Sequence, residues 1–114
     1  MLNENDNIIE LIESSEECIR IWNFHSGEML KKLSLGVCFH MICLWDSDYL
    51  FAAEFKTIKL IDLKKGIVVK TLTKHKNDVN NIKDIVHPNY GKCLLTQDYD
   101  GILLWINKIN FIIT

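Results

Sequence analysis

Apolar and polar residues alternate in several short stretches along this chain of 114 residues. Around residue 20, for example, Ile19 and Ile21 alternate with Arg20 and Trp22. Alternation with this period, in β-branched and aromatic residues, predicts strands, because successive side chains of a strand point to opposite faces. Glycine, asparagine and aspartate separate the stretches, as in tight turns. Ten strands are predicted, at 7–14, 18–24, 28–34, 37–45, 49–54, 57–63, 67–73, 79–86, 92–97 and 101–107, with an eleventh possible at 111–114.

The pattern repeats along the chain. At an offset of 39, residues 19–22 fall on residues 58–61, and Gly27 falls on Gly66. A third copy, at 102–106, follows the second at an offset of 44. A helix beginning at Ser14 is the alternative for the first copy, but the other copies lack its capping residues. Three copies spaced by about 40 residues indicate an array of similar units.

The last copy, residues 71–107, contains the most features of a known repeat. Lys74-His75 is followed by Val79, then by a strand that closes at Pro88 and Gly91, and finally by a strand that ends in Trp105. In this order of features the chain resembles the WD-repeat family of β-propellers. The resemblance implies an all-β fold of antiparallel blades that form an incomplete propeller of about two and a half blades. The units expected are an N-terminal tail at 1–6, WD-repeat-like blades at 7–107 (about 7–33, 34–72 and 73–107), and a C-terminal partial strand or tail at 108–114.

The resemblance also implies a buried polar network in each blade, built in the family from His, Asp, Ser or Thr, and Trp. Here His75, Thr96 and Trp105 stand near those positions. The family's aspartate falls on Tyr99, so Asp98 or Asp100 would have to replace it, and Asp98 is the residue we assign. The Trp-Asp pair that gives the family its name is intact in none of the copies, which read Trp-Asn, Ile-Asp and Trp-Ile.

The function that the resemblance implies is a non-enzymatic protein-interaction module or scaffold. Loops at one end of the blades would bind a protein partner, and the candidate residues are Lys74, His75, Asp98 and Asp100. One alternative is a structural subunit that supplies blades to a larger propeller. Another is a β-fold enzyme that uses His75. A closed propeller needs at least four blades, so self-association, or a place in a longer propeller, is expected.

Charge, hydropathy and cysteine spacing exclude several classes of function and site. The formal net charge of −2 argues against nucleic-acid binding, which needs a basic surface. No apolar stretch has the ~18–20 residues that a membrane helix needs, and no secretory leader is evident, so a cytoplasmic protein is expected. Cys38, His40 and Cys43 lie close together but lack a second Cys/His pair at ligand spacing. No metal site, cofactor or catalytic residue is therefore predicted.

Overall fold

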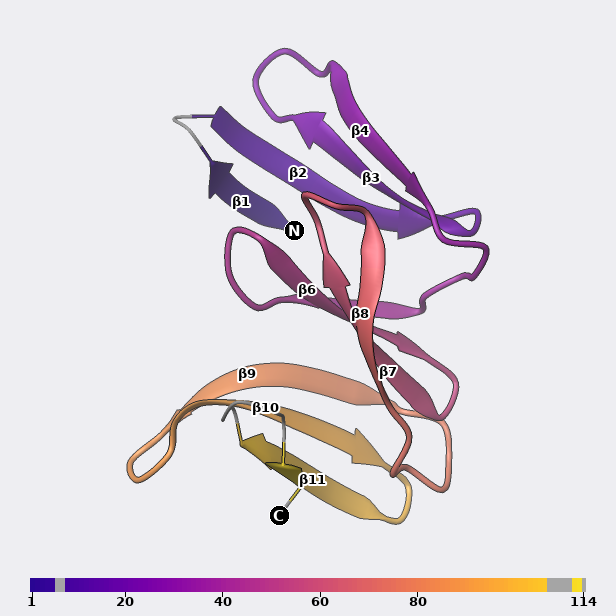
Figure 1. The fold of residues 1–114 in the computed structure, drawn as a ribbon, viewed down its shortest axis with the longest axis vertical. Helices are drawn as coiled ribbons and strands as arrows, with labels where there is room; N and C mark the ends of the chain where they lie inside the picture. Colours follow the sequence, from indigo (N-terminus) through magenta and orange to yellow (C-terminus); the bar gives the residue numbers. More distant parts are fainter. Residues whose placement is uncertain (6–7, 107–111, 114) are drawn as a thin grey trace.

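The computed structural model describes residues 1–5, 8–106 and 112–113, and these form three four-stranded antiparallel sheets (Figure 1). Each sheet is a meander in which consecutive strands pair. The first sheet contains β1 (Leu2–Asn5), β2 (Ile8–Ser15), β3 (Cys18–Asn23) and β4 (Met29–Ser34). The middle sheet contains β5 (Met41–Leu44), β6 (Tyr49–Glu54), β7 (Thr57–Asp62) and β8 (Ile67–Leu72). The last sheet contains β9 (Asn81–His87), β10 (Gly91–Asp98), β11 (Gly101–Ile106) and β12 (Ile112–Ile113).

The N-terminal end of the chain differs from the sequence prediction. Residues 2–5, expected in a tail at 1–6, form β1 and pair with β2 in the register Leu2↔Leu11. The first sheet therefore has four strands, and three sheets stand where about two and a half were expected. Of the expected C-terminal unit at 108–114, only 112–113 is described, as β12 paired with β11, and the rest lies outside the described residues.

A repeated turn explains why the sequence pattern recurs at an offset of 39. The side-chain oxygen of Asn23 accepts hydrogen bonds from two backbone N–H groups, both at 3.0 Å, and Asp62 does the same at 2.9 Å. Four residues later, Gly27 and Gly66 have φ values of 73° and 68°, where glycine is favoured. A Cβ at Gly66 would also lie 3.0 Å from Leu33 Cδ2, so a side chain at this turn would crowd the first sheet as well.

The hydrophobic core lies between the sheets rather than within any one of them. Ile12, Ile19, Ile21 and Leu33 of the first sheet pack on one face of the middle sheet, around Leu50 and Ile61. The opposite face of the middle sheet packs on the last sheet, and that cluster comprises Cys43, Trp45, Phe51, Ala53, Ile58, Leu60, Leu72, Val79, Leu94 and Trp105. The middle sheet is therefore covered on both faces, as expected for strands that are apolar on both sides.

Polar contacts add to both joints between sheets. Lys31 Nζ of β4 donates to the backbone carbonyl groups of Leu63 and Lys64, at 2.9 and 2.6 Å. At the second joint, Lys92 donates to the carbonyl of Trp45 and lies 4.5 Å from the centre of its ring, within range of a cation–π interaction. These bonds satisfy loop carbonyl groups and help fix how the sheets are stacked.

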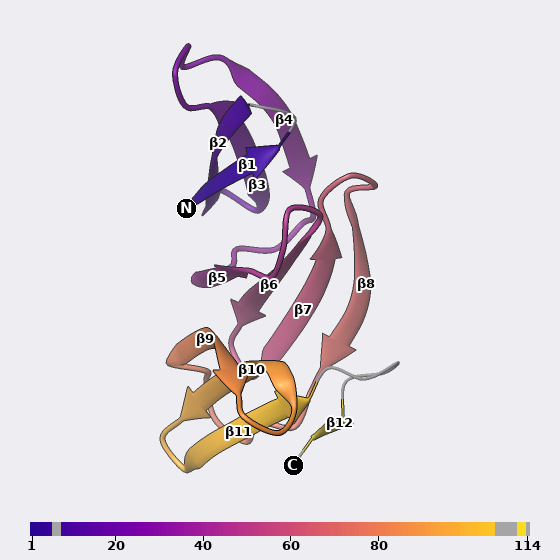
Figure 2. The same ribbon diagram turned by 90° about the vertical axis from the view of Figure 1, so that its left-hand side faces the viewer.

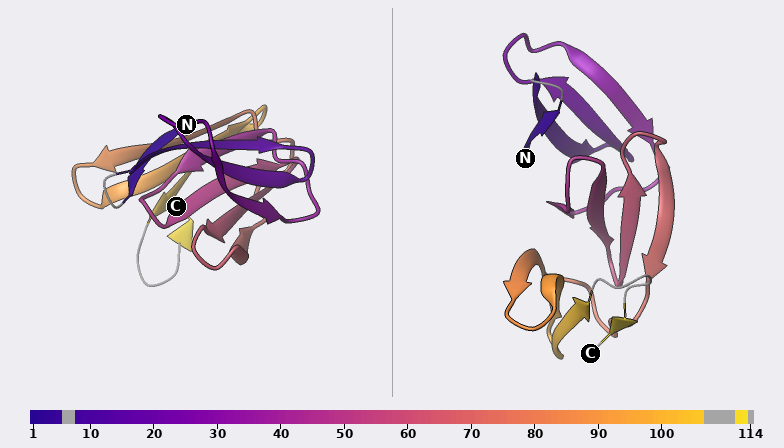
Figure 3. Two further views of the ribbon diagram at one scale, coloured as in Figure 1. Left: turned by 90° about the horizontal axis from the view of Figure 1, so that it is seen from above. Right: turned by 60° about the vertical axis from the view of Figure 1, so that its left-hand side comes forward.

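The three sheets form a curved stack in which the first strands β1, β5 and β9 lie on one side and β4 and β8 on the other (Figures 2 and 3). The β2–β3, β6–β7 and β10–β11 turns and the links between sheets lie along one edge, on the right in Figure 1. Backbone hydrogen bonds hold each link to a turn, as from Leu35 N to Glu17 O and from Val79 N to Phe55 O. Nowhere in the described part of the chain is there a helix of the length and apolar character needed to cross a membrane.

Candidate functional site

The site begins with the two-residue turn between β10 and β11. Asp98 ends β10 and pairs with Gly101 in the strand register, which leaves Tyr99 and Asp100 in the turn. One carboxylate oxygen of Asp98 accepts hydrogen bonds from the backbone N–H groups of Asp100 and Gly101, at 2.7 and 3.1 Å. The side chain is thereby fixed, because aspartate at this place bonds the backbone of its own turn.

A chain of hydrogen bonds runs from this aspartate into the core. Trp105 Nε1–H donates to Thr96 Oγ1 at 2.8 Å. The same hydroxyl lies 2.6 Å from His75 Nε2, and His75 Nδ1 lies 2.7 Å from the second oxygen of Asp98. All donors and acceptors of the network are paired when the imidazole is neutral with its proton on Nδ1. Thr96 Oγ1–H then donates to Nε2, and Nδ1–H donates to the carboxylate of Asp98. The structure thus brings together His75, Thr96, Asp98 and Trp105, the four residues assigned to the blade network.

The network is buried, and its polar atoms are hydrogen-bonded to one another. The four side chains are at most 6% exposed, and no buried side-chain N or O atom in the described part of the chain lacks a partner. The hydrogen bond from His75, assisted by backbone N–H groups of the turn, holds the pKa of the Asp98 carboxyl below its usual value. Because both ring nitrogens of His75 are hydrogen-bonded to residues of β10, the imidazole ties the link that carries it to the last sheet.

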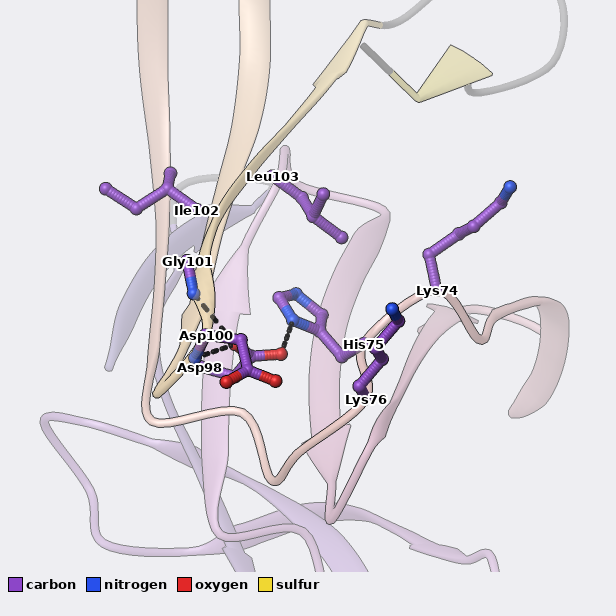
Figure 4. Close-up of a pocket in the computed structure, with 8 residues that line it drawn as sticks. All are labelled: Lys74, His75, Lys76, Asp98, Asp100, Gly101, Ile102 and Leu103. Carbon is purple, nitrogen blue, oxygen red and sulfur yellow. Dashed lines mark hydrogen bonds and ion pairs between the residues drawn. The ribbon is translucent and has the colours of Figure 1, made fainter.

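A polar cavity of about 510 Å³ lies beside this network (Figure 4). Of the four residues predicted for partner binding, Lys74 and Asp100 are exposed at its rim, whereas His75 and Asp98 are buried behind them. Asp100 accepts a hydrogen bond from Asn77 at 2.5 Å, which ties the turn to the link. The complete lining comprises Lys74, His75, Lys76, Asp98, Asp100, Gly101, Ile102 and Leu103.

The cysteines offer no metal centre within the described residues. Cys38 is exposed, Cys43 is buried, and His40 Nε2 lies 2.8 Å from the carbonyl oxygen of Val79. No cluster of three or more His, Cys, Asp or Glu residues in residues 1–5, 8–106 and 112–113 is arranged to hold a metal ion.

The first sheet contains a related arrangement that the sequence analysis did not identify. Trp22 Nε1 donates to Glu13 Oε1 at 3.2 Å, and Arg20 bonds Ser15 at 2.6 Å and Glu16 at 3.1 Å. At an offset of 83, Trp22 falls on Trp105 and Glu13 falls on Thr96. The repeat itself was thus the signal: the same tryptophan-to-acceptor bond occurs in both sheets with a different acceptor.

Two exposed aromatic residues lie in the turns at the same edge. Phe55 is 67% exposed in the β6–β7 turn, and Tyr99 is 88% exposed in the β10–β11 turn. The repeat offsets of 39 and 44 make Glu16, Phe55 and Tyr99 equivalent positions. Phe55 has a φ of 51°, which is rare for a bulky side chain. Two neighbouring sheets therefore display an aromatic side chain from the same turn position.

Solved structures that match this arrangement of sheets include WD40 β-propellers. The WD40 β-propeller domain of Doa1 matches with a TM-score of 0.68 and 22% sequence identity, over 96% of this chain and 36% of that one. U3-55K matches with a TM-score of 0.67 and 14% identity, over 98% of this chain and 35% of that one. No protein-family model and no curated protein matches the sequence.

The chain therefore has the fold of part of a WD40 β-propeller, and it spans about a third of the length of the two propellers compared above. Its three sheets correspond to blades, and they do not close into a ring. The prediction of an all-β, incomplete propeller is confirmed. With the fold assigned, we call the three sheets the first, middle and last blades.

Proposed function

We propose that the chain is a non-enzymatic protein-interaction module that binds a partner through the edge formed by its β6–β7 and β10–β11 turns. The observation that carries this proposal is the display of Phe55 and Tyr99 at equivalent positions of neighbouring blades. Exposed aromatic side chains are the commonest anchors of protein interfaces. WD40 propellers as a class support a binding role, and the expected cytoplasmic location is part of the same proposal.

The frame behind this edge supports binding rather than turnover. The aromatic side chains stand on tight turns between paired strands, and the neighbouring link is held by the buried His75–Asp98 bond. A surface fixed in this way loses little conformational entropy when a partner binds. Lys74 and Lys76 flank the cavity beside Tyr99 and add charged groups at the rim, where polar contacts improve specificity.

The test compares two variants with the wild-type chain as bait. Phe55→Ser with Tyr99→Ser removes both aromatic anchors, and Val86→Ser is the matched control, because Val86 is an 84% exposed apolar residue of β9 outside the turns. Proteins that the wild type captures from cytosol are identified and their affinities measured. We expect the double variant to weaken binding at least about 100-fold, since two anchors typically contribute several kcal/mol. Equal binding by the double variant and the wild type would refute the proposal.

A further inference from the structure

The outer face of the first blade carries a row of apolar side chains. Leu2, Leu11, Trp22 and Met29 lie opposite one another in the strand register and so share this face. Leu2 is 53%, Leu11 36% and Met29 46% exposed. With Phe24, which is 51% exposed, Leu11 and Trp22 line an apolar depression of about 380 Å³. A monomer seldom leaves a contiguous apolar face of this kind uncovered.

The repeat shows what such a face does elsewhere in the molecule. At an offset of 39, Leu11 falls on Leu50 and Trp22 falls on Ile61. Leu50 and Ile61 are fully buried, because the first blade covers that face of the middle blade. The outer face of the first blade thus has the composition and register of a face that accepts a preceding blade. By the same register the face also carries Glu13, Arg20 and Lys32. Glu13 is bonded to Trp22 and lies 3.6 Å from Arg20, so the face can be covered without leaving that carboxylate unpaired.

The last blade shows the complementary half of the same joint. Ile19 and Ile58, at equivalent positions in the first two blades, are 0% exposed because each packs on the blade that follows. Their equivalent in the last blade, Ile102, is 59% exposed and points to the side of β11 opposite Leu103 and His75 (Figure 4). Leu104 is two positions after Ile102 on β11 and so lies on the same face. Leu95 of β10 pairs with Leu104 in the strand register and therefore shares this outer face.

We infer that two copies of this chain associate head to tail, so that the outer face of each last blade packs on the outer face of the other copy's first blade. The molecule makes this joint twice internally, between the first and middle blades and between the middle and last blades. Both halves of the joint occur on one chain, so a second copy can supply the matching face for each. The inference does not depend on the partner-binding edge proposed above.

Two is the number of copies that closes the ring. Two chains of three blades give six blades, within the range of about four to eight that closed propellers use, whereas three chains would give nine. Closure also favours the dimer over a filament, because the second joint forms within an already associated pair and its association entropy has already been lost. A head-to-tail joint that closes by two-fold rotation uses every outer face and leaves no end for further growth.

The first measurement is the mass of the purified chain in solution by sedimentation equilibrium. The inference predicts a concentration-dependent dimer of about twice 13.3 kDa that does not grow further. A chain that remains monomeric at concentrations up to about 1 mM, or one that forms an open-ended polymer, would overturn it. This result is independent of partner capture, so either proposal can fail alone.

Two substitutions, one on each face, distinguish head-to-tail pairing from other dimers. Leu11→Glu disrupts the accepting face and Ile102→Glu the opposite face, and each alone should weaken dimerisation at least about 100-fold by burying an unpaired charge. Mixing the two variants restores one intact joint per pair, so mixed dimers should form where neither variant dimerises alone. This recovery also shows that the variants are folded. Val86→Glu is the control and should dimerise like the wild type.

A dimer that pairs two identical faces gives a different result. If two first blades faced each other, Leu11→Glu would abolish the dimer and Ile102→Glu would leave it unchanged. That outcome, or mixed variants that remain monomeric while both dimerise poorly alone, would refute the head-to-tail arrangement.

Discussion

The first and last blades carry a tryptophan at the same place in the repeat, yet the two indole groups have different surroundings. Trp105 is 1% exposed beneath the middle blade, whereas Trp22 is partly exposed on an outer face. Both donate their Nε1–H to a residue nine positions earlier on the adjacent strand. The position in the repeat therefore fixes the hydrogen bond, while the neighbouring blade decides whether the ring is buried.

The acceptor differs in a way that follows from this burial. In the last blade it is the hydroxyl of Thr96, which bonds His75 and leaves no charge of its own in the core. In the first blade it is the carboxylate of Glu13, which is still partly exposed and lies 3.6 Å from Arg20. A carboxylate is tolerated there because water and a cation compensate it, whereas transfer of an unpaired charge into a core is costly. The comparison shows how one backbone frame accommodates two kinds of polar network.

The largest expected effect comes from removing the two tryptophans separately. Trp105→Ala should lower the free energy of unfolding by about 3–5 kcal/mol, because it leaves a cavity in the core. Trp22→Ala should cost about 1 kcal/mol, because that ring is partly exposed already. Urea denaturation measures both, in the Ile102→Glu background so that no second copy covers Trp22. Equal losses would contradict the view that the neighbouring blade sets the contribution of this position.

A smaller effect is expected from the hydroxyl that joins the network. Thr96→Val keeps the shape of the side chain but leaves Trp105 Nε1–H and His75 Nε2 without their shared partner. Buried polar groups left in this state typically cost about 1–3 kcal/mol. Thr71→Val, at an exposed position of β8, is the matched control and should change stability by less than about 0.5 kcal/mol. If urea denaturation shows the same small change for both, the network contributes nothing through Thr96.

The smallest expected effect is on how the free energy of unfolding falls at acidic pH. The pKa of Asp98 lies below its ordinary value of 3.8 in the folded chain, so on acidification the unfolded chain binds this proton first. The stabilisation from Asp98 is complete above about pH 5 and is lost as the pH falls through the folded-state pKa. Asp98→Asn should flatten the decline in the urea midpoint below pH 4. Asp78→Asn, at an exposed aspartate, should keep the wild-type decline, and an unchanged profile in Asp98→Asn would contradict this account.

Much of this arrangement could be predicted from local sequence. The alternation around Ile19, Ile58 and Ile102 gave the strands, and turn residues such as Gly27 and Gly66 gave their limits. The choice between Asp98 and Asp100 depended on strand register, which a single sequence specifies poorly. Pairing of Asp98 with Gly101 puts Asp98 at the end of a strand with its side chain toward the core, and it leaves Asp100 in the exposed turn.

The features that were missed depend on contacts distant in sequence. Residues 2–5 have the composition of a tail, but they are paired with β2, and Asn3 donates to the carbonyl of Ser47 in the middle blade at 3.2 Å. His75 and Asp98 were predicted both for the buried network and among the partner-binding residues, and the hydrogen bond between them buries both side chains. Exposure of a loop residue is decided by its partner, and the partner is 23 positions away here.

The backbone of Phe55 has a consequence for how this chain can change over time. A left-handed conformation at a bulky residue costs about 1–3 kcal/mol, and the ring, 67% exposed, recovers little of that cost by burial within the chain. Glycine or asparagine would fit the turn with less strain. Selection for stability alone would therefore favour glycine or asparagine at this turn position. If related sequences keep phenylalanine here, that would indicate selection for a contact with another molecule rather than for stability of the fold.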